Sequence, residues 1–98
     1  MTPEGKAKAV VRTLLKKHGC YVVMPMTAGM GNSGVSDFIC CHKGRFFGVE
    51  VKANTQVSAL QAANLHMIEQ AGGRAFVVRI NLKQQTGLDE LVNFLENV

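Results

Sequence analysis

The stretch "GVSDFICCHKGRFFGVEVK", residues 34–52, decides the fold that this sequence predicts. It contains two runs rich in β-branched and aromatic residues, 35–42 and 45–52, with only Lys43 and Gly44 between them. Runs of this composition are typical of strands, and a two-residue connection that contains glycine favours a tight antiparallel hairpin. We therefore expect a β-hairpin at the centre of the chain.

Charged side chains lie at the open end of this hairpin. Side chains alternate along a strand, which places Glu50 and Lys52 on one face and Val49 and Val51 on the other. Asp37 is nearly as far from the turn as Glu50, so the two carboxylates are expected to be neighbours. Neighbouring carboxylates repel each other unless a cation compensates, and Lys52 together with a bound divalent ion would do so. The alternative is an exposed salt-bridge cluster of little consequence for stability.

The rest of the chain predicts three helices and two further strands. An amphipathic helix capped by Thr2 ends at Gly19, and a second helix runs from Ser58 to the Gly72–Gly73 pair. The remaining segments are a strand over 20–26, a glycine-rich loop over 27–34, a strand over 74–80 and an amphipathic helix from Leu88. The order helix, strand, strand, strand, helix, strand, helix predicts an α/β fold with a mixed sheet in one domain, residues 1–98.

Composition narrows the class of partner. Eleven Lys and Arg against seven Asp and Glu give a net charge of +4, which suits a polyanion such as DNA. Six aromatic residues and no Trp argue against a stacking platform for single strands.

An odd number of cysteines, no signal peptide and no apolar run long enough for a bilayer predict a cytoplasmic protein with no membrane partner. The contiguous Cys40, Cys41 and His42 cannot readily close around one zinc ion.

Four motifs occur in an order and spacing that resemble the PD-(D/E)XK nuclease superfamily and, within it, the VRR-NUC family. They are "TAGMGNSGVSD" (27–37), "GVEVK" (48–52), "SALQ" (58–61) and "GGRAFVVR" (72–79). Ser36 stands where the name of the superfamily expects proline, although this position supplies no ligand. The resemblance spans nearly the whole chain and implies a restriction-endonuclease-like core.

The resemblance also implies roles for individual residues. Asp37, Glu50 and the backbone carbonyl of Val51 would bind Mg²⁺ or Mn²⁺, and Lys52 would serve catalysis. Glu4 is similar to an additional acidic residue that the family places near its site. An acidic residue in the first turn of a helix is, however, also favoured by the helix dipole alone.

Two further sets of residues have both a functional and a structural interpretation. Gln61 is similar to a helix-borne glutamine of the family, yet Ser58 and Gln61 also form the pattern of a capping box. Basic side chains on the first helix and at the hairpin turn would either follow a phosphate backbone or simply face solvent. The expected DNA-contacting residues are Lys8, Arg12, Lys16, Lys43, Arg45 and Ser58.

The activity that these features imply is a Mg²⁺- or Mn²⁺-dependent, structure-selective DNA endonuclease that uses metal-activated water. A domain of this size has limited surface for duplex DNA, and stand-alone members of the family resemble enzymes that resolve four-way (Holliday) junctions, so a homodimer acting on branched DNA is expected. The alternatives are a nickase, a flap-type nuclease, and a DNA-binding module without activity.

Overall fold

The computed structural model describes residues 1–26 and 34–97, which form three helices around a mixed sheet. The elements follow in the order α1 (Pro3–Lys17), β1 (Tyr21–Val23), β2 (Phe38–His42), β3 (Arg45–Lys52), α2 (Ala59–Gln70), β4 (Arg74–Ile80), β5 (Gln85–Thr86) and α3 (Leu88–Glu96). The sheet order is β1-β2-β3-β4-β5, with β3 and β4 parallel and the other neighbouring pairs antiparallel. The predicted α/β class with a mixed sheet is confirmed. Within the described residues, no helix has both the length and the apolar character needed to cross a bilayer.

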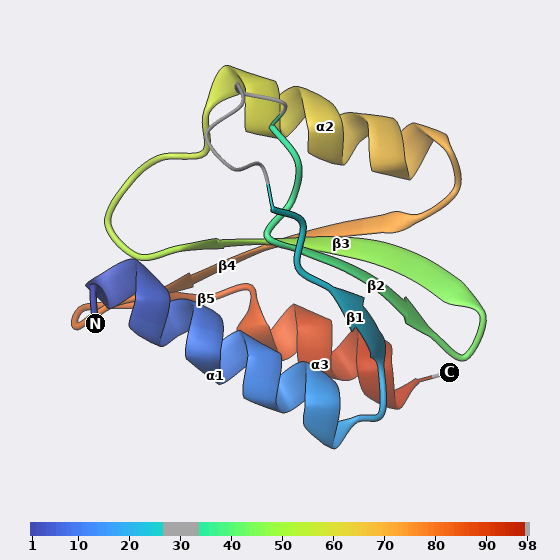
Figure 1. Ribbon diagram of the computed structural model, residues 1–98, viewed down its shortest axis with the longest axis horizontal. Helices are drawn as coiled ribbons and strands as arrows, with labels where there is room; N and C mark the ends of the chain where they lie inside the picture. Colours follow the sequence, from blue (N-terminus) through green and yellow to red (C-terminus); the bar gives the residue numbers. More distant parts are fainter. Residues whose placement is uncertain (27–33, 98) are drawn as a thin grey trace.

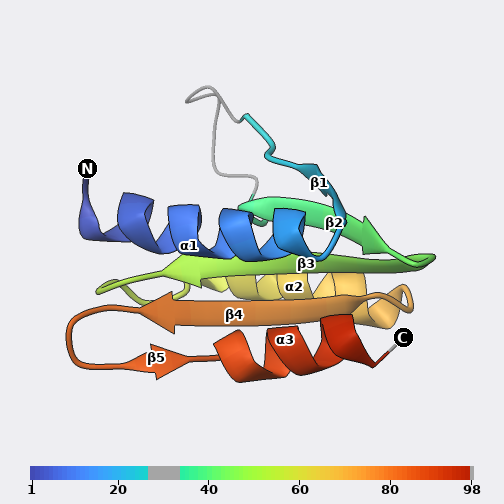
Figure 2. The ribbon, with the colours of Figure 1, turned by 90° about the horizontal axis from the view of Figure 1, so that it is seen from below.

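The helices cover both faces of the sheet. Helix α2 lies on one face, and α1 and α3 lie side by side on the other (Figures 1 and 2). Strand β3 runs through the middle, and its end lies beside the start of α1 (Figure 2). This arrangement brings the acidic end of the predicted hairpin close to the first turn of α1.

The main core lies between the sheet and the layer of α1 and α3. Three phenylalanine rings meet there: Phe47 and Phe94 pack edge to face with centroids 5.2 Å apart, and Phe76 and Phe94 are tilted with centroids 5.1 Å apart. The apolar stripe of α1 completes this core through Ala7, Val11 and Leu15. Burial of these side chains from water is the principal force that fixes α1 and α3 against β3 and β4.

The layer on the other face is thinner. Leu65 is the buried residue of α2, and the helix packs closely because β3 carries Gly48 there. A Cβ atom on Gly48 would lie 2.7 Å from Cδ1 of Ile68 and 3.0 Å from Oγ of Ser36. The absence of a side chain at Gly48 therefore sets how near α2 approaches the strand that carries Glu50.

The hairpin forms as predicted, with its turn at Lys43 and Gly44. Both residues have positive φ, 52° and 80°, as two-residue hairpin turns with the twist of the flanking strands require. The ladder pairs Phe38 with Val49. Continued by one residue, this register sets Asp37 opposite Glu50.

Some boundaries differ from the sequence prediction. The strand expected over 20–26 is shorter, Tyr21–Val23, and ends before Pro25. The strand expected from residue 35 begins at Phe38, so Asp37 precedes the strand rather than lying in it. The two-residue strand β5 was not predicted, because Gln85 and Thr86 are polar and exposed and have no strand-like pattern. The loop predicted over 27–34 lies almost wholly outside the described residues.

Candidate metal centre

Asp37, Glu50 and Lys52 converge at the end of β3, as the spacing predicted. Their surroundings are not those of an exposed salt-bridge cluster: Glu50 is 2% exposed and Lys52 8% exposed. Helix α2 covers this face of the sheet (Figure 1), so the alternation of charged and apolar residues along β3 does not separate solvent from core. Buried charges are costly unless they are paired or bind an ion.

The carboxylate of Glu50 is only partly paired. Its Oε2 lies 3.6 Å from Nζ of Lys52, while its Oε1 is buried and has no hydrogen-bond partner in the described part of the chain. Burial raises the pKa of Glu50, the nearby charge of Asp37 raises it further, and Lys52 only partly opposes both, so that the pKa is about 7. An unpartnered, buried carboxylate oxygen beside a second carboxylate is a suitable donor for a hard divalent cation.

Asp37 is fixed by contacts on both of its oxygens. The backbone N–H of Val51 donates to Oδ2 at 2.7 Å, and Nζ of Lys8 lies 3.2 Å from Oδ1. The bond to Val51 holds the Asp37 side chain against the end of β3, beside Glu50. Asp37 and Glu50, the two predicted side-chain ligands, thus lie together beside the backbone of Val51 at the end of β3.

Lys8 is an unexpected member of this site. Its Nζ lies between Oδ1 of Asp37 and Oε2 of Glu4, which is 3.6 Å away. Burial acts to lower the pKa of Lys8, but Asp37 and Glu4 outweigh it and the pKa is raised. The sequence prediction gave Lys8 a phosphate-contacting role only. The one available signal was the spacing of Glu4 and Lys8, since residues four apart on a helix are neighbours.

Within the described residues, Glu4 is linked to the site through Lys8. In the parts of the chain that the structure describes, no group of three or more His, Cys, Asp or Glu side chains is arranged to hold a metal ion. Glu4 therefore does not form a three-carboxylate cluster with Asp37 and Glu50 in this conformation. Asp37 and Glu50 would be the two side-chain ligands, with Val51 contributing its carbonyl oxygen.

The segment after Lys52 is held by β4 and the turn that follows it. Nη1 of Arg79 donates to the carbonyls of Ala53 at 3.2 Å and Thr55 at 2.8 Å, and Nδ2 of Asn81 donates to Ala53 at 2.7 Å. Arg79 is the register partner of Lys52 in the parallel ladder. The sequence analysis included Arg79 in the motif 72–79 without giving it a role and did not single out Asn81, because a hydrogen bond to a backbone carbonyl leaves no pattern in the sequence.

Gln61 and Ser58 form the capping box that their spacing predicted. Oε1 of Gln61 accepts from the Ser58 backbone N–H at 3.0 Å, and Oγ of Ser58 accepts from the Gln61 N–H at 3.1 Å. This structural role begins α2. A role of either residue toward DNA stays a prediction.

Ser36, which stands in place of the expected proline, is 1% exposed and bound to α2. Its Oγ accepts a hydrogen bond from Nδ2 of Asn64 at 3.2 Å. A proline would offer no such acceptor. This bond links the residue before Asp37 to the helix that covers Glu50, and sequence reasoning missed it.

The basic residues among the predicted DNA contacts fall into two separate regions, α1 and the hairpin turn, and Ser58 lies apart from both at the start of α2. Arg12 and Lys16 are exposed on α1, the helix that carries Lys8. Lys43 and Arg45 lie at the turn, roughly 20 Å from Asp37 along the hairpin at about 3.3 Å per residue. Arg45 is already engaged with α3: its guanidinium carbon lies 3.8 Å from the centre of the Phe94 ring, and Nη1 donates to the Phe94 carbonyl at 3.4 Å.

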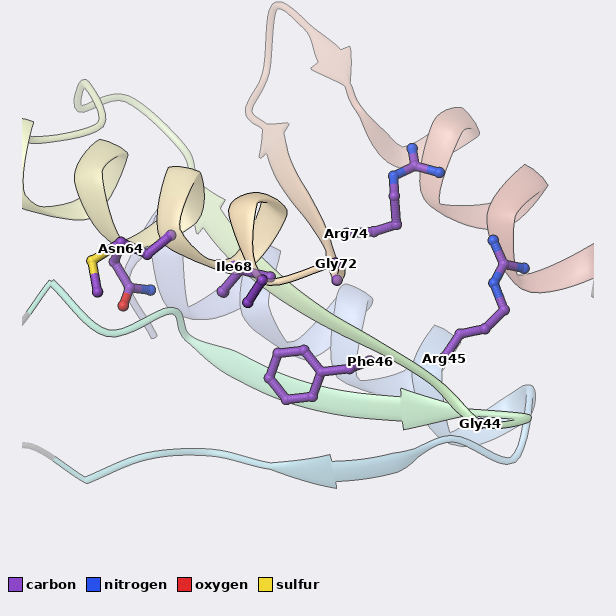
Figure 3. A pocket seen from close by; sticks show the side chains of 10 residues that line it. Gly44, Arg45, Phe46, Asn64, Ile68, Gly72 and Arg74 are labelled. Atoms are coloured by element: carbon purple, nitrogen blue, oxygen red, sulfur yellow. The ribbon is translucent and has the colours of Figure 1, made fainter.

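A hollow of about 630 Å³ lies near the turn, not at the carboxylates. It is lined from β3, the end of α2 and the start of β4, and its residues include Phe46, Asn64 and Ile68 (Figure 3). Neither Asp37, Glu50 nor Lys52 lines it. The hollow is therefore separate from the candidate metal centre.

Comparison with known proteins bears on the fold. The structure is similar to that of Hjc, a Holliday junction resolvase from Archaeoglobus fulgidus, an archaeal hyperthermophile, with a TM-score of 0.60 and 17% sequence identity over 79% of this chain and 67% of that chain. No sequence-family model and no curated protein matches the chain, so membership of the VRR-NUC family stays a prediction. The likeness to Hjc shows that the chain has a restriction-endonuclease-like fold.

Proposed function

We propose that the protein is a divalent-metal-dependent DNA endonuclease that cleaves branched DNA, with four-way junctions as its preferred substrate. The observation that carries this proposal is the buried Glu50 carboxylate, whose Oε1 has no partner in the described chain, lying beside Asp37 and Lys52. The fold likeness to Hjc supports the choice of substrate class, because that protein is a Holliday junction resolvase.

Each residue of the centre has a distinct task in this proposal. Asp37, braced by the N–H of Val51, and Glu50 would hold Mg²⁺ or Mn²⁺ together with the Val51 carbonyl. When bound, the ion would supply Lewis-acid polarisation of the phosphate and a lowered pKa for its water. The ammonium of the buried Lys52, held near Glu50, would stabilise the negative charge that develops on the phosphoryl oxygens.

DNA would approach along α1. Arg12 and Lys16 are exposed on the helix whose Lys8 contacts Asp37, so phosphates bound there would lead toward the centre. Arg45 would contribute less to DNA binding, because its guanidinium group already contacts the ring and the carbonyl of Phe94 on α3.

Paired cleavage of a four-way junction requires two active sites, so we propose that the protein acts as a homodimer. The outer strand β1 supports this view, because it and the residues that follow it expose Tyr21, Val23, Met24 and Met26 at one edge of the sheet. A self-complementary interface there would cover apolar surface and an unpaired strand edge. Sedimentation velocity measures the oligomeric state, and a monomer at micromolar concentration would contradict the dimer.

The central experiment is a cleavage assay with labelled four-way junction, nicked duplex, flap and linear duplex. Each substrate is incubated with Mg²⁺, with Mn²⁺ or with EDTA. Symmetric paired cuts in the junction alone are expected, and only with a metal. Preferential cutting of the nicked or flap substrate would instead select a nickase or a flap-type nuclease.

Lys52→Met separates catalysis from binding. The variant is expected to bind the junction with nearly unchanged affinity and to cut it at least 100-fold more slowly, a loss of about 3 kcal/mol of transition-state stabilisation. Lys83→Met removes an exposed lysine near β5 and serves as the matched control with normal cleavage. If Lys52→Met cuts normally, or if the wild-type protein binds DNA but never cuts it, the proposed activity is wrong.

A further inference from the structure

We propose that Lys8 is a built-in counter-ion of the metal centre, which occupies the acidic side chains in the metal-free protein and must be displaced from Asp37 when a divalent ion binds. The inference concerns regulation of the site described above and rests on the proposed function. It predicts that Lys8 lowers the affinity for metal, whereas a lysine that only contacts phosphate would leave this affinity nearly unchanged.

The contacts of Lys8 carry the inference. Its Nζ lies 3.2 Å from Oδ1 of Asp37 and 3.6 Å from Oε2 of Glu4, whereas Oδ2 of Asp37 already accepts the Val51 N–H. Oδ1 is therefore the Asp37 oxygen whose partner is a side chain and not the backbone, and that side chain is Lys8. A divalent ion and an ammonium group cannot both lie in contact with that oxygen without strong mutual repulsion.

The charge balance of the centre leads to the same conclusion. With every group charged, Glu4, Asp37 and Glu50 bring three negative charges, and Lys8 and Lys52 bring two positive ones. Addition of a divalent ion with both lysines in place would leave a net charge of +1 around the buried Glu50 and Lys52. If the Lys8 ammonium leaves, the net charge of the centre becomes zero. A neutral centre costs less free energy than a charged one where the dielectric constant is low.

The side chain of Lys8 is able to leave. It is about one-third exposed, unlike that of Lys52, which is 10% exposed. Four methylene groups allow its ammonium to turn from the carboxylates toward solvent, or toward a phosphate, while the helix stays in place. Lys52 lacks this freedom and remains beside Glu50.

The test measures Mn²⁺ binding by electron paramagnetic resonance, without DNA, at pH 8. Lys8→Met and Lys8→Gln are expected to bind Mn²⁺ at least about fivefold more tightly than the wild-type protein, because the competing charge is gone. Lys8→Arg retains the charge and should stay within about twofold of wild type. Lys16→Met removes an equal charge from the same helix, away from the carboxylates, and is the matched control with unchanged affinity.

Thermal unfolding provides a second readout and shows whether each variant folds. Mn²⁺ should raise the melting temperature of Lys8→Met by more than it raises that of the wild-type protein, since tighter binding to the folded state stabilises it more. Equal or weaker Mn²⁺ binding by both Lys8→Met and Lys8→Gln overturns the inference and leaves the proposed nuclease function standing. Failure of the wild-type protein and all Lys8 variants to bind Mn²⁺ overturns the metal-dependent function itself.

Discussion

The raised pKa of Glu50 predicts that metal affinity depends steeply on pH near neutrality. At a pKa of about 7, most Glu50 side chains carry a proton at pH 6, and a metal ion must displace that proton to bind. Between pH 8 and pH 6 the apparent dissociation constant for Mn²⁺ should therefore rise about tenfold, equivalent to about 1.4 kcal/mol. A carboxyl group with the ordinary pKa of 4.5 would change this constant by only about 3% over the same range.

Isothermal titration calorimetry in buffers of different ionisation enthalpy measures both the affinity and the protons released. About 0.9 proton per bound ion should be released at pH 6 and about 0.1 at pH 8. Glu90→Gln, which removes an exposed carboxylate on α3, is the control and should retain the full pH dependence. An affinity that is constant from pH 6 to pH 8, with no proton release at pH 6, would show that Glu50 is ionised throughout and would refute the reasoning.

The same shift predicts how the metal-free protein responds to pH. A carboxyl group whose folded pKa is raised contributes stability that is fully present below its unfolded pKa and is lost as the pH rises through the folded value. For Glu50 this window runs from 4.5 to about 7, and the contribution lost is on the order of 3 kcal/mol. Metal binding should offset this loss, so the stabilisation by Mn²⁺ should be larger at pH 8 than at pH 5.

Four further substitutions test three separate parts of the structure. Gly34 has φ of +69°, and a Cβ atom there would lie 2.5 Å from the Leu60 carbonyl oxygen, so Gly34→Ala should lower the free energy of unfolding by about 1–3 kcal/mol in urea denaturation. Arg79→Met removes two hydrogen bonds to the segment after Lys52 and should cost about 1–3 kcal/mol in the same measurement; an unchanged midpoint would show that these bonds contribute nothing net. Arg12→Met and Lys16→Met should each reduce the slope of log affinity for DNA against log salt by about one, and unchanged slopes would place DNA elsewhere.

The fold could be predicted from the sequence largely because its decisive features are local. The Lys43–Gly44 turn and the equal lengths of its flanking runs fix the hairpin register, and that register sets Asp37 opposite Glu50. Strand β5 was not predicted, because two exposed polar residues show no alternation of apolar and polar side chains. It pairs with β4, and that strand is formed by an apolar run of its own. Local patterns thus predicted four of the five strands and missed the short edge strand β5.

The site was predicted less completely, because what surrounds a residue is a property of the whole fold. The alternation along β3 placed Glu50 and Lys52 on one face of the strand but did not show whether that face is buried; α2 covers it, and both residues are buried. The contact of Lys8 with Asp37 joins residues 29 positions apart, on a helix and beside a strand, and no spacing rule connects them. The residue types of the site were readable in the sequence, whereas their burial and charge pairing were not.

The charges at this centre are better explained by function than by stability. Replacement of a buried ion pair by apolar side chains is often neutral or stabilising, so Glu50 and Lys52 are a poor choice if only the fold matters. The arrangement is poorer still for stability because Oε1 of Glu50 has no partner in the described chain and the adjacent Asp37 raises the pKa of the same carboxyl group. Both defects disappear if a cation lies between the two carboxylates, because it supplies the missing partner and cancels the repulsion. The features that destabilise the metal-free protein are thus the ones that would give a bound ion its affinity.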